Sequence, residues 1–142
     1  MNVRLFLFCL LAFTSFGQDY WEVRDSIKGA PRAGMATFVL GNRGYAVGGI
    51  KVDGSTRKMY SYSKPQNDWD DELSLGGLTG GGLERNLACG FSLHGKGYVC
   101  LGEGLGSAFM NDLWEFDKAN QTWTQKADFI GTPRRGATSF VI

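Results

Sequence analysis

The sequence of 142 residues contains a single histidine, three cysteines and three prolines. The only histidine, His94, stands beside Gly95 in a turn-rich segment, where a solvated turn residue is expected. A copper site built from histidines and tyrosines therefore has too few ligands here. No Ser-His-Asp, Walker or dinucleotide-binding motif appears either. The sequence predicts no catalytic residue, no metal site and no cofactor.

The chain also lacks an excess of charge of either sign. It has 15 Lys and Arg residues and 14 Asp and Glu residues. Residues 1–17 contain one basic residue, Arg4, and no acid, so the remainder holds 14 of each. A protein without net charge gains little from an anionic surface. We therefore expect neither a nucleic-acid partner nor attraction to an anionic membrane.

Long apolar runs are absent apart from a short one near the start. Arg4 is followed by an apolar run over residues 5–13 and then by small residues. This order is typical of a secretory signal, and the run is shorter than the roughly 20 residues needed to cross a bilayer. We predict a signal peptide at 1–17, a mature domain at 18–142 and no membrane span. A secreted, periplasmic or cell-surface location follows.

A pattern that opens with an arginine recurs three times along the mature chain. Arg32, Arg85 and Arg134 stand 53 and then 49 residues apart, and each is followed six residues later by a phenylalanine. A period of about 50 residues indicates units that bury their apolar faces only by stacking on neighbours. The period predicts a repeat architecture.

The pattern of each unit predicts four antiparallel strands. In the second copy, residues 87–93 and 98–102 flank a glycine-rich turn and predict a hairpin. Residues 111–117 alternate apolar and polar side chains, as a half-buried strand does, and residues 123–127 form a more polar fourth strand. The sequence predicts an all-β meander in each unit.

The two ends of the mature chain match each other at an offset of 102 residues. Residues 21–32 resemble residues 123–134, including Gly29 with Gly131. The mature chain is therefore expected to begin on the fourth strand of one unit and to end on the first strand of another. Closed rings of such units usually need four to eight of them. We expect the N-terminal part of a longer ring.

These residues resemble kelch repeats, which build one class of β-propeller. The arginine that opens each unit, the glycine doublet after Tyr45 and the strand at 111–117 followed by a tryptophan carry the resemblance. The second copy departs from it where Leu101 stands in place of the first glycine. The residues that match the repeat signature are Gly48, Gly49, Gly102, Trp69, Trp114 and Trp123.

The resemblance covers almost the whole mature chain and is closest to secreted bacterial proteins of the galactose oxidase and kelch superfamily. It implies an all-β, kelch-type β-propeller of four-stranded antiparallel blades, incomplete in this chain. It also implies that the strand opened by arginine is innermost in each blade and that the strand holding Trp123 is outermost. Kelch propellers generally bind proteins or carbohydrates on one face of the ring, and a minority are enzymes.

Two sets of side chains are candidates for ligand binding. Arg32, Arg85 and Arg134 are expected at the mouth of the central channel, where guanidinium groups could grip a carboxylate. The alternative is that each arginine binds neighbouring loop carbonyls and acids. The tryptophans could stack on sugars, but packing between blades is the simpler interpretation.

The two cysteines of the mature chain, Cys89 and Cys100, fall in one predicted hairpin. If Gly41 lies opposite Gly44 in the first copy, the same register places Cys89 opposite Gly102 in the second. The cysteines are then diagonal neighbours, near the upper edge of disulfide geometry. This register favours a buried thiol pair over a bridge.

The resulting hypothesis is an exported, non-catalytic module that binds an unidentified protein or glycan. The alternative is a carbohydrate-active enzyme, similar to a sialic-acid mutarotase or to galactose oxidase, with its catalytic residues in further blades. A purely structural surface array is the third possibility.

Overall fold

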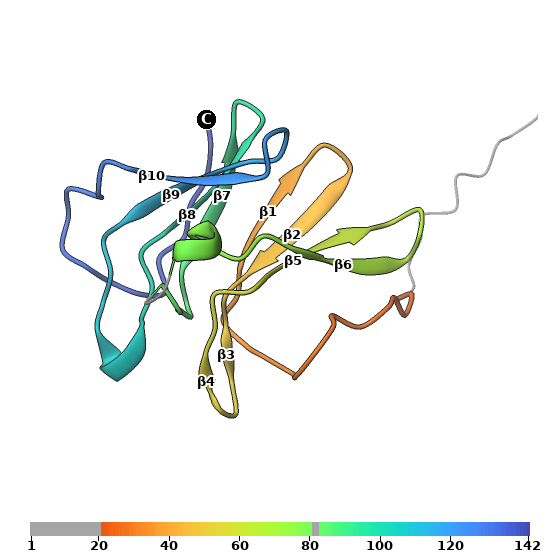
Figure 1. Cartoon of the computed structure of the whole chain (residues 1–142), viewed down its shortest axis with the longest axis horizontal. Coiled ribbons are helices and arrows are strands. Elements are labelled where there is room, and N and C mark those ends of the chain that lie inside the picture. Colours follow the sequence, from red (N-terminus) through yellow and green to blue (C-terminus); the bar gives the residue numbers. More distant parts are fainter. Residues whose placement is uncertain (1–20, 81–82) are drawn as a thin grey trace, which may run out of the picture.

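Two four-stranded antiparallel sheets form the framework of this computed structural model, which describes residues 21–80 and 83–142 (Figure 1). The predicted signal peptide lies outside the described residues. The first sheet has the order β1 (Ala36–Leu40), β2 (Arg43–Val47), β5 (Met59–Ser63), β6 (Asp68–Glu72). The second sheet has the order β7 (Cys89–Leu93), β8 (Lys96–Cys100), β9 (Leu113–Asp117), β10 (Thr122–Lys126).

Each sheet is a meander, as the repeat predicted. The first is interrupted by a small hairpin of β3 (Ile50–Lys51) and β4 (Gly54–Ser55) between β2 and β5. Two short 3₁₀ turns, η1 (Gly77–Thr79) and η2 (Leu105–Ser107), lie in the loops. The expected all-β architecture of four-stranded antiparallel units is confirmed.

Alternation of side chains decides which face of each strand is buried. In β1, Ala36, Phe38 and Leu40 are buried, whereas Thr37 and Val39 are exposed. This period of two is the one that a half-buried strand requires. It turns one face of the first sheet towards the second.

The register expected for both hairpins is wrong by two residues. His94 and Gly95 have φ values of 48° and 74°, so they form a two-residue turn with Leu93 directly opposite Lys96. In the first sheet, Leu40 likewise lies opposite Arg43. The turn therefore has the expected two residues but begins one residue earlier, and Cys89 lies directly opposite Cys100.

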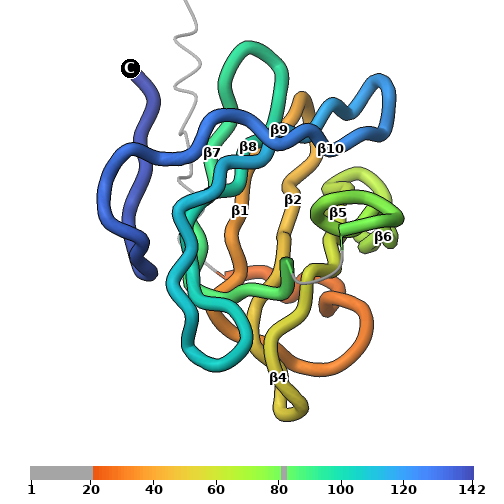
Figure 2. The backbone as a smooth tube through the Cα atoms, turned by 60° about the vertical axis from the view of Figure 1, so that its left-hand side comes forward, coloured from red at the N-terminus to blue at the C-terminus, as the bar shows by residue number. Residues whose placement is uncertain are grey.

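The innermost strands of the two sheets, β1 and β7, lie side by side (Figure 2). Gly90 of β7 is so close to β1 that an added Cβ would lie 2.5 Å from the Thr37 carbonyl oxygen. Ser92 hydrogen bonds to the backbone of Val39 across the same junction. Small residues on β7 thus let two strands from different sheets pack backbone to backbone.

Aromatic rings fill the space between the sheets. Phe38 stacks on Tyr45 with ring centroids 5.1 Å apart, and both rings pack against Phe116 of the second sheet. Trp123 covers Phe116 at 5.0 Å. The core of the molecule is therefore the interface between two units, as expected of repeats that stack.

Contacts between units recur along the chain. The Trp123 indole donates a hydrogen bond to the carbonyl of Leu73, four residues after Trp69. The Trp69 indole donates equivalently to Asp25, four residues after Trp21. The residues that follow Trp21 therefore make the same contact with the first sheet that the residues after β6 make with the second sheet.

The C-terminal segment repeats the contacts of the other inner strands. The Gly49 N–H donates to the carbonyl of Arg85 at 2.8 Å, and the Gly102 N–H donates to that of Arg134 at 2.9 Å. Neither 21–32 nor 127–142 forms a strand, because no further strand of the described residues is available to pair with it. The expected fourth and first strands are therefore not formed, although Asp25 and Arg134 accept the same hydrogen bonds as their equivalents in the other units.

The close packing at β8 can be tested with two equivalent glycines. A Cβ at Gly97 would overlap the Phe38 ring, whereas a Cβ at Gly44, the equivalent residue of the first sheet, meets nothing within 4 Å. Gly97→Ala should lower the free energy of unfolding by roughly 1–3 kcal/mol through overpacking. Gly44→Ala should change it by about 0.5 kcal/mol or less. Urea denaturation measures both, and equal effects would contradict this packing.

Candidate functional site

The loops that enter β1 and β7 and those that leave β2 and β8 gather at one end of the sheets. The β3–β4 hairpin and η2 lie at this end, opposite the β1–β2 and β7–β8 turns (Figure 1). Short bridges pair Ala33 with Ile50 and Asn86 with Glu103. These bridges hold the loops around the beginning of each innermost strand, where ligand-binding residues were expected.

The three repeated arginines share one contact. In Arg32, Arg85 and Arg134, the Nε–H donates to the carbonyl of the residue two positions earlier, at 3.3, 3.2 and 2.9 Å. The guanidinium of each residue is thereby turned back onto its own loop. The repeat in sequence is thus a repeat in geometry.

Arg85 is the most deeply buried of the three, with 1% of its surface exposed. It forms a bidentate ion pair with Asp112, at 2.6 and 2.7 Å, and donates to the Leu101 carbonyl. Asp112 also accepts a hydrogen bond from the Trp114 indole at 2.7 Å. Burial alone would raise the pKa of Asp112, but the hydrogen bonds and charge of Arg85 outweigh it and hold that pKa below its ordinary value.

Arg32 has different surroundings because Lys58 occupies the position that Asp112 occupies in the second unit. Its Nη2 lies 3.4 Å from the Tyr60 hydroxyl, and the guanidinium lies 4.9 Å from the centre of the Tyr60 ring. Its Nη1 is buried and has no hydrogen-bond partner among the described residues. Arg32 therefore lacks the carboxylate that fixes Arg85.

Arg134 is exposed and lies over the ring of Phe129, 5.3 Å from its centre. All three arginines thus contact loop carbonyls, an acid or an aromatic ring of the chain itself. These contacts agree with the alternative interpretation, in which each arginine binds neighbouring loop carbonyls and acids. Binding of a carboxylate ligand by the three arginines stays a prediction.

A second group of polar side chains, which the sequence analysis missed, includes the residues directly after Arg85 and Arg134. We call it the loop-end cluster, and it comprises Ser55, Asn86, Glu103 and Arg135. The Asn86 amide donates to the Ser55 hydroxyl at 2.9 Å and to the Glu103 carbonyl at 3.2 Å. Arg135 forms an ion pair with the Glu103 carboxylate. The cluster joins loops from three successive units.

The chemistry of the loop-end cluster suits a polar ligand. The hydrogen bond from Arg135 lowers the pKa of Glu103 from its ordinary value, so this carboxylate is ionised at neutral pH. The Arg135 guanidinium lies 5.7 Å from the centre of the Phe109 ring, which is 51% exposed. An exposed ring beside planar hydrogen-bonding groups offers both an apolar surface and directional polar contacts.

The missed residues do carry a signal in the sequence. Ala33, Asn86 and Arg135 each directly follow one of the repeated arginines. The arginine repeats because it holds the loop, whereas the next residue differs in every unit. Ala33 and Arg135 are exposed, whereas Asn86 is buried, so this position has no common environment in the three units.

The glycines of the repeat signature are required by their backbone. Gly49 and Gly102 have φ values of 94° and 105°, and a Cβ at Gly102 would lie 2.9 Å from the Asn86 carbonyl. Leu101, at the position equivalent to Gly48, adopts a φ of 62° although it is not a glycine. The departure from the repeat therefore keeps the left-handed conformation and adds a buried side chain.

The tryptophans of the signature lie at different depths. Trp114 and Trp123 pack against the core, while Trp69 lies against Tyr62 with ring centroids 5.2 Å apart. Trp21 is fully exposed. Two of the four indoles also donate the hydrogen bonds between units described above.

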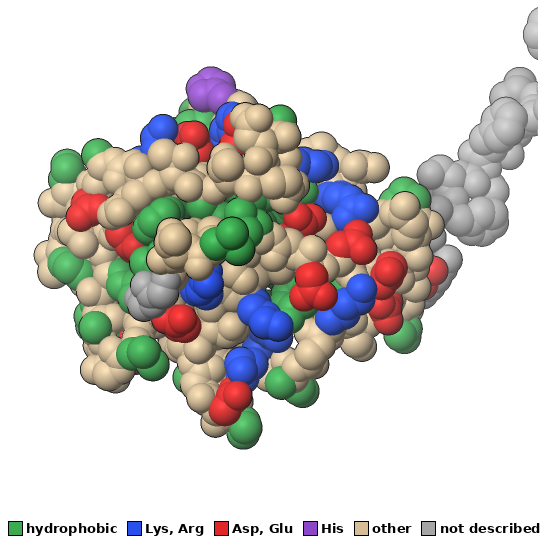
Figure 3. All heavy atoms as spheres, viewed as in Figure 1, with side chains coloured by type: hydrophobic (Ala, Val, Ile, Leu, Met, Phe, Trp, Pro, Cys, Tyr) green, Lys and Arg blue, Asp and Glu red, His purple; other side chains and the backbone are tan. Residues whose placement is uncertain are grey.

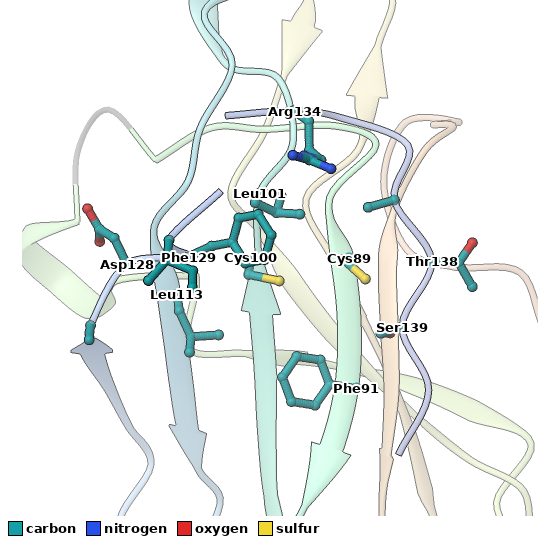
Figure 4. Close-up of a pocket in the computed structure, with 13 residues that line it drawn as sticks. Cys89, Phe91, Cys100, Leu101, Leu113, Asp128, Phe129, Arg134, Thr138 and Ser139 are labelled. Carbon is teal, nitrogen blue, oxygen red and sulfur yellow. The ribbon is translucent and has the colours of Figure 1, made fainter. Parts of the chain in front are cut away.

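A cavity of about 560 Å³ lies between the second sheet and the C-terminal segment (Figure 4). Cys89, Phe91, Cys100 and Leu113 line its sheet side. Their equivalents in the first sheet all belong to the buried core: Ala36, Phe38, Val47 and Met59. The cavity is therefore the position at which another sheet would pack, and it is not evidence of a small-molecule site.

Acidic and basic side chains are intermixed on the face that carries β5 and β6 (Figure 3). Within residues 21–80 and 83–142, no three His, Cys, Asp or Glu side chains are grouped so that they could hold a metal ion. The same residues contain no helix of the length and hydropathy needed to cross a bilayer.

Comparison with solved structures relates these sheets to a known fold. The structure of YjhT matches this chain with a TM-score of 0.71 over 82% of the chain, at 16% sequence identity. The fold is an incomplete kelch-type β-propeller. The chain spans 44% of the length of YjhT, and no protein-family model and no curated protein matches its sequence. Because the identity is low, the likeness concerns the fold alone.

The two arginines Arg85 and Arg32 give a matched test of the buried ion pair. Arg85→Gln should lower the free energy of unfolding by about 3 kcal/mol, because it leaves the Asp112 carboxylate buried without its cation. Arg32→Gln loses no carboxylate partner and should cost about 1 kcal/mol or less. Urea denaturation at neutral pH measures both.

The pH dependence of the same variants checks the cause. The depressed pKa of Asp112 stabilises the wild-type propeller above the ordinary carboxyl pKa, and this contribution is lost as the pH falls through the folded value. In Arg85→Gln, burial without the cation should raise that pKa instead. The stability gap between the two proteins should therefore narrow from pH 7 to pH 3. A constant gap would exclude Asp112 as its origin.

Proposed function

We propose that the chain is part of an exported kelch-type propeller that binds a protein or a glycan without catalysis. The observation that carries this proposal is the loop-end cluster, in which Glu103 and Arg135 lie beside the exposed ring of Phe109 and Asn86 donates to the Glu103 carbonyl. The cluster lies at the loop end of the innermost strands, and ligand-binding residues are commonly placed on loops held by a rigid scaffold. Export is proposed from the apolar run near the start of the chain.

The stability of the loops supports a binding role. Arg85 and Asp112 fix the loop directly before Asn86, and the Gly102 N–H is held by the Arg134 carbonyl directly before Arg135. Polar groups that are fixed before a ligand arrives lose less conformational entropy on binding. The loop-end cluster is therefore better suited to recognition than a set of mobile surface side chains.

A carbohydrate-active enzyme remains the second candidate. Such an activity needs an acid, a base or metal ligands near the channel, which further blades would have to supply. The described residues contribute one carboxylate to the cluster, Glu103, and the pKa of this group is lowered rather than raised. A general acid at neutral pH requires the opposite shift.

Binding can be tested on an array of neutral and acidic oligosaccharides and on a sialylated mucin before and after removal of its glycans. We expect retention on at least one of these probes. Arg135→Ala should weaken it about 10-fold or more, because a charged hydrogen-bonding group is lost. Binding to intact mucin alone identifies a glycan, and binding to both forms identifies protein.

Lys64→Ala is the matched control, because it removes one positive charge from the β5–β6 turn at the opposite end of the sheets. Equal weakening by Lys64→Ala and Arg135→Ala would contradict a site at the loop end. Absence of binding to every probe would contradict the glycan form of the proposal. Faster equilibration of the anomers of N-acetylneuraminic acid, followed by NMR, would instead favour the enzyme.

A further inference from the structure

We propose that Cys89 and Cys100 form a redox-active pair that closes a cross-strand disulfide between β7 and β8. The two residues lie directly opposite each other in the ladder. Facing residues of an antiparallel pair have Cα atoms about 4.5 or 5.5 Å apart, depending on the type of pair. Both separations lie within the range of about 4.4–6.8 Å that a disulfide accepts. This inference is independent of the ligand-binding proposal.

The equivalent residues of the first unit show what is special about this pair. Ala36 and Val47 also face each other, and both are buried against the second sheet. The same position therefore normally holds an apolar core pair. In the second unit it holds two thiols, both free in the structure.

Access to the pair differs between its two members. Cys89 is buried, whereas Cys100 is partly exposed, and both line the cavity beside the C-terminal segment (Figure 4). Burial, together with the neighbouring Cys89 thiol, raises the pKa of Cys100 to about 11. A small oxidant can reach Cys100 through the cavity, but the reactive thiolate is scarce at neutral pH.

The oxidant that completes the reaction is a low-molecular-weight disulfide such as oxidised glutathione. The Cys100 thiolate attacks one sulfur of that disulfide, which forms a mixed disulfide and releases one glutathione thiol. The Cys89 thiolate then attacks the Cys100 sulfur and releases the second glutathione. The protein loses two electrons and two protons, and one glutathione disulfide becomes two thiols.

The bond would fix the innermost strand of the second sheet to its neighbour. Cys89 opens β7, directly after the loop that carries Arg85 and Asn86. The face that holds both sulfurs is the one left open by the unfilled cavity. A disulfide at this position therefore preserves the hairpin register at the edge where a further sheet would pack.

Peptide mapping detects the bond directly. The full chain is equilibrated with oxidised glutathione at pH 8.5, alkylated and digested with trypsin without reduction. Cleavage at Arg85, Lys96 and Lys118 places Cys89 and Cys100 on separate peptides, 86–96 and 97–118, and Cys9 on a third. We expect 86–96 to be recovered covalently joined to 97–118, with the mass of the pair reduced by two hydrogens.

The matched control is the double variant Cys89→Ala with Cys100→Val, which recreates the core pair of the first unit. The melting temperature of the wild-type chain should fall by roughly 5 °C or more when the bond is reduced. That of the double variant should be the same in oxidising and reducing buffer. Formation of the linked species should also accelerate as the pH rises above 8.5.

Two outcomes would overturn the proposal. One is recovery of both peptides alkylated after oxidation, which would mean that the thiols stay free. The other is glutathione attached to Cys100 without progression to the linked species, since this would show that Cys89 cannot reach its neighbour. A redox-dependent melting temperature in the double variant would assign the stabilisation to another cause.

Discussion

The close approach of β1 and β7 is the constraint on which the rest of this structure depends. Neither sheet can bury an apolar face by itself, so Phe38 and Tyr45 of one must pack against Phe116 of the other. That packing is possible only because β7 and β8 present glycine where the partner sheet is nearest. Each unit is therefore stabilised mainly by its contacts with the neighbouring unit, as in other repeat proteins.

The same constraint explains the features at both edges of the described chain. The first sheet packs one face against the second sheet, and the second sheet has an equivalent face that no other sheet of the described residues covers. The cavity beside Phe91 is the visible result. At the opposite edge, the Trp69 indole donates a hydrogen bond to the carbonyl of Asp25. Asp25 is thus equivalent to Leu73, the residue of the first unit that accepts a hydrogen bond from Trp123. Both edges thus show the contacts that one unit makes with its neighbour.

The strands could be predicted from the sequence because side-chain alternation and the 50-residue period follow directly from burial on one face. The hairpin register could not, since it depends on His94 adopting a positive φ, which glycine spacing alone does not reveal. The loop-end cluster was missed for a related reason. Asn86 and Arg135 have no repeated counterpart, whereas the arginines beside them do. The ion pair of Arg85 could not be predicted from the repeat either, because its partner Asp112 is replaced by Lys58 in the first unit.

Arg85 and the residue after it, Asn86, have different roles in the loop. The guanidinium of Arg85 uses its donors on Asp112 and on loop carbonyls, so it is occupied by the fold. The next residue, Asn86, is buried and donates to Ser55 and to the Glu103 carbonyl, whereas its equivalents Ala33 and Arg135 are exposed. A substitution at the exposed Ala33 or Arg135 therefore costs little of the packing between the sheets. The repeated arginine thus holds its own loop in every unit, while the surroundings of the residue after it differ from unit to unit.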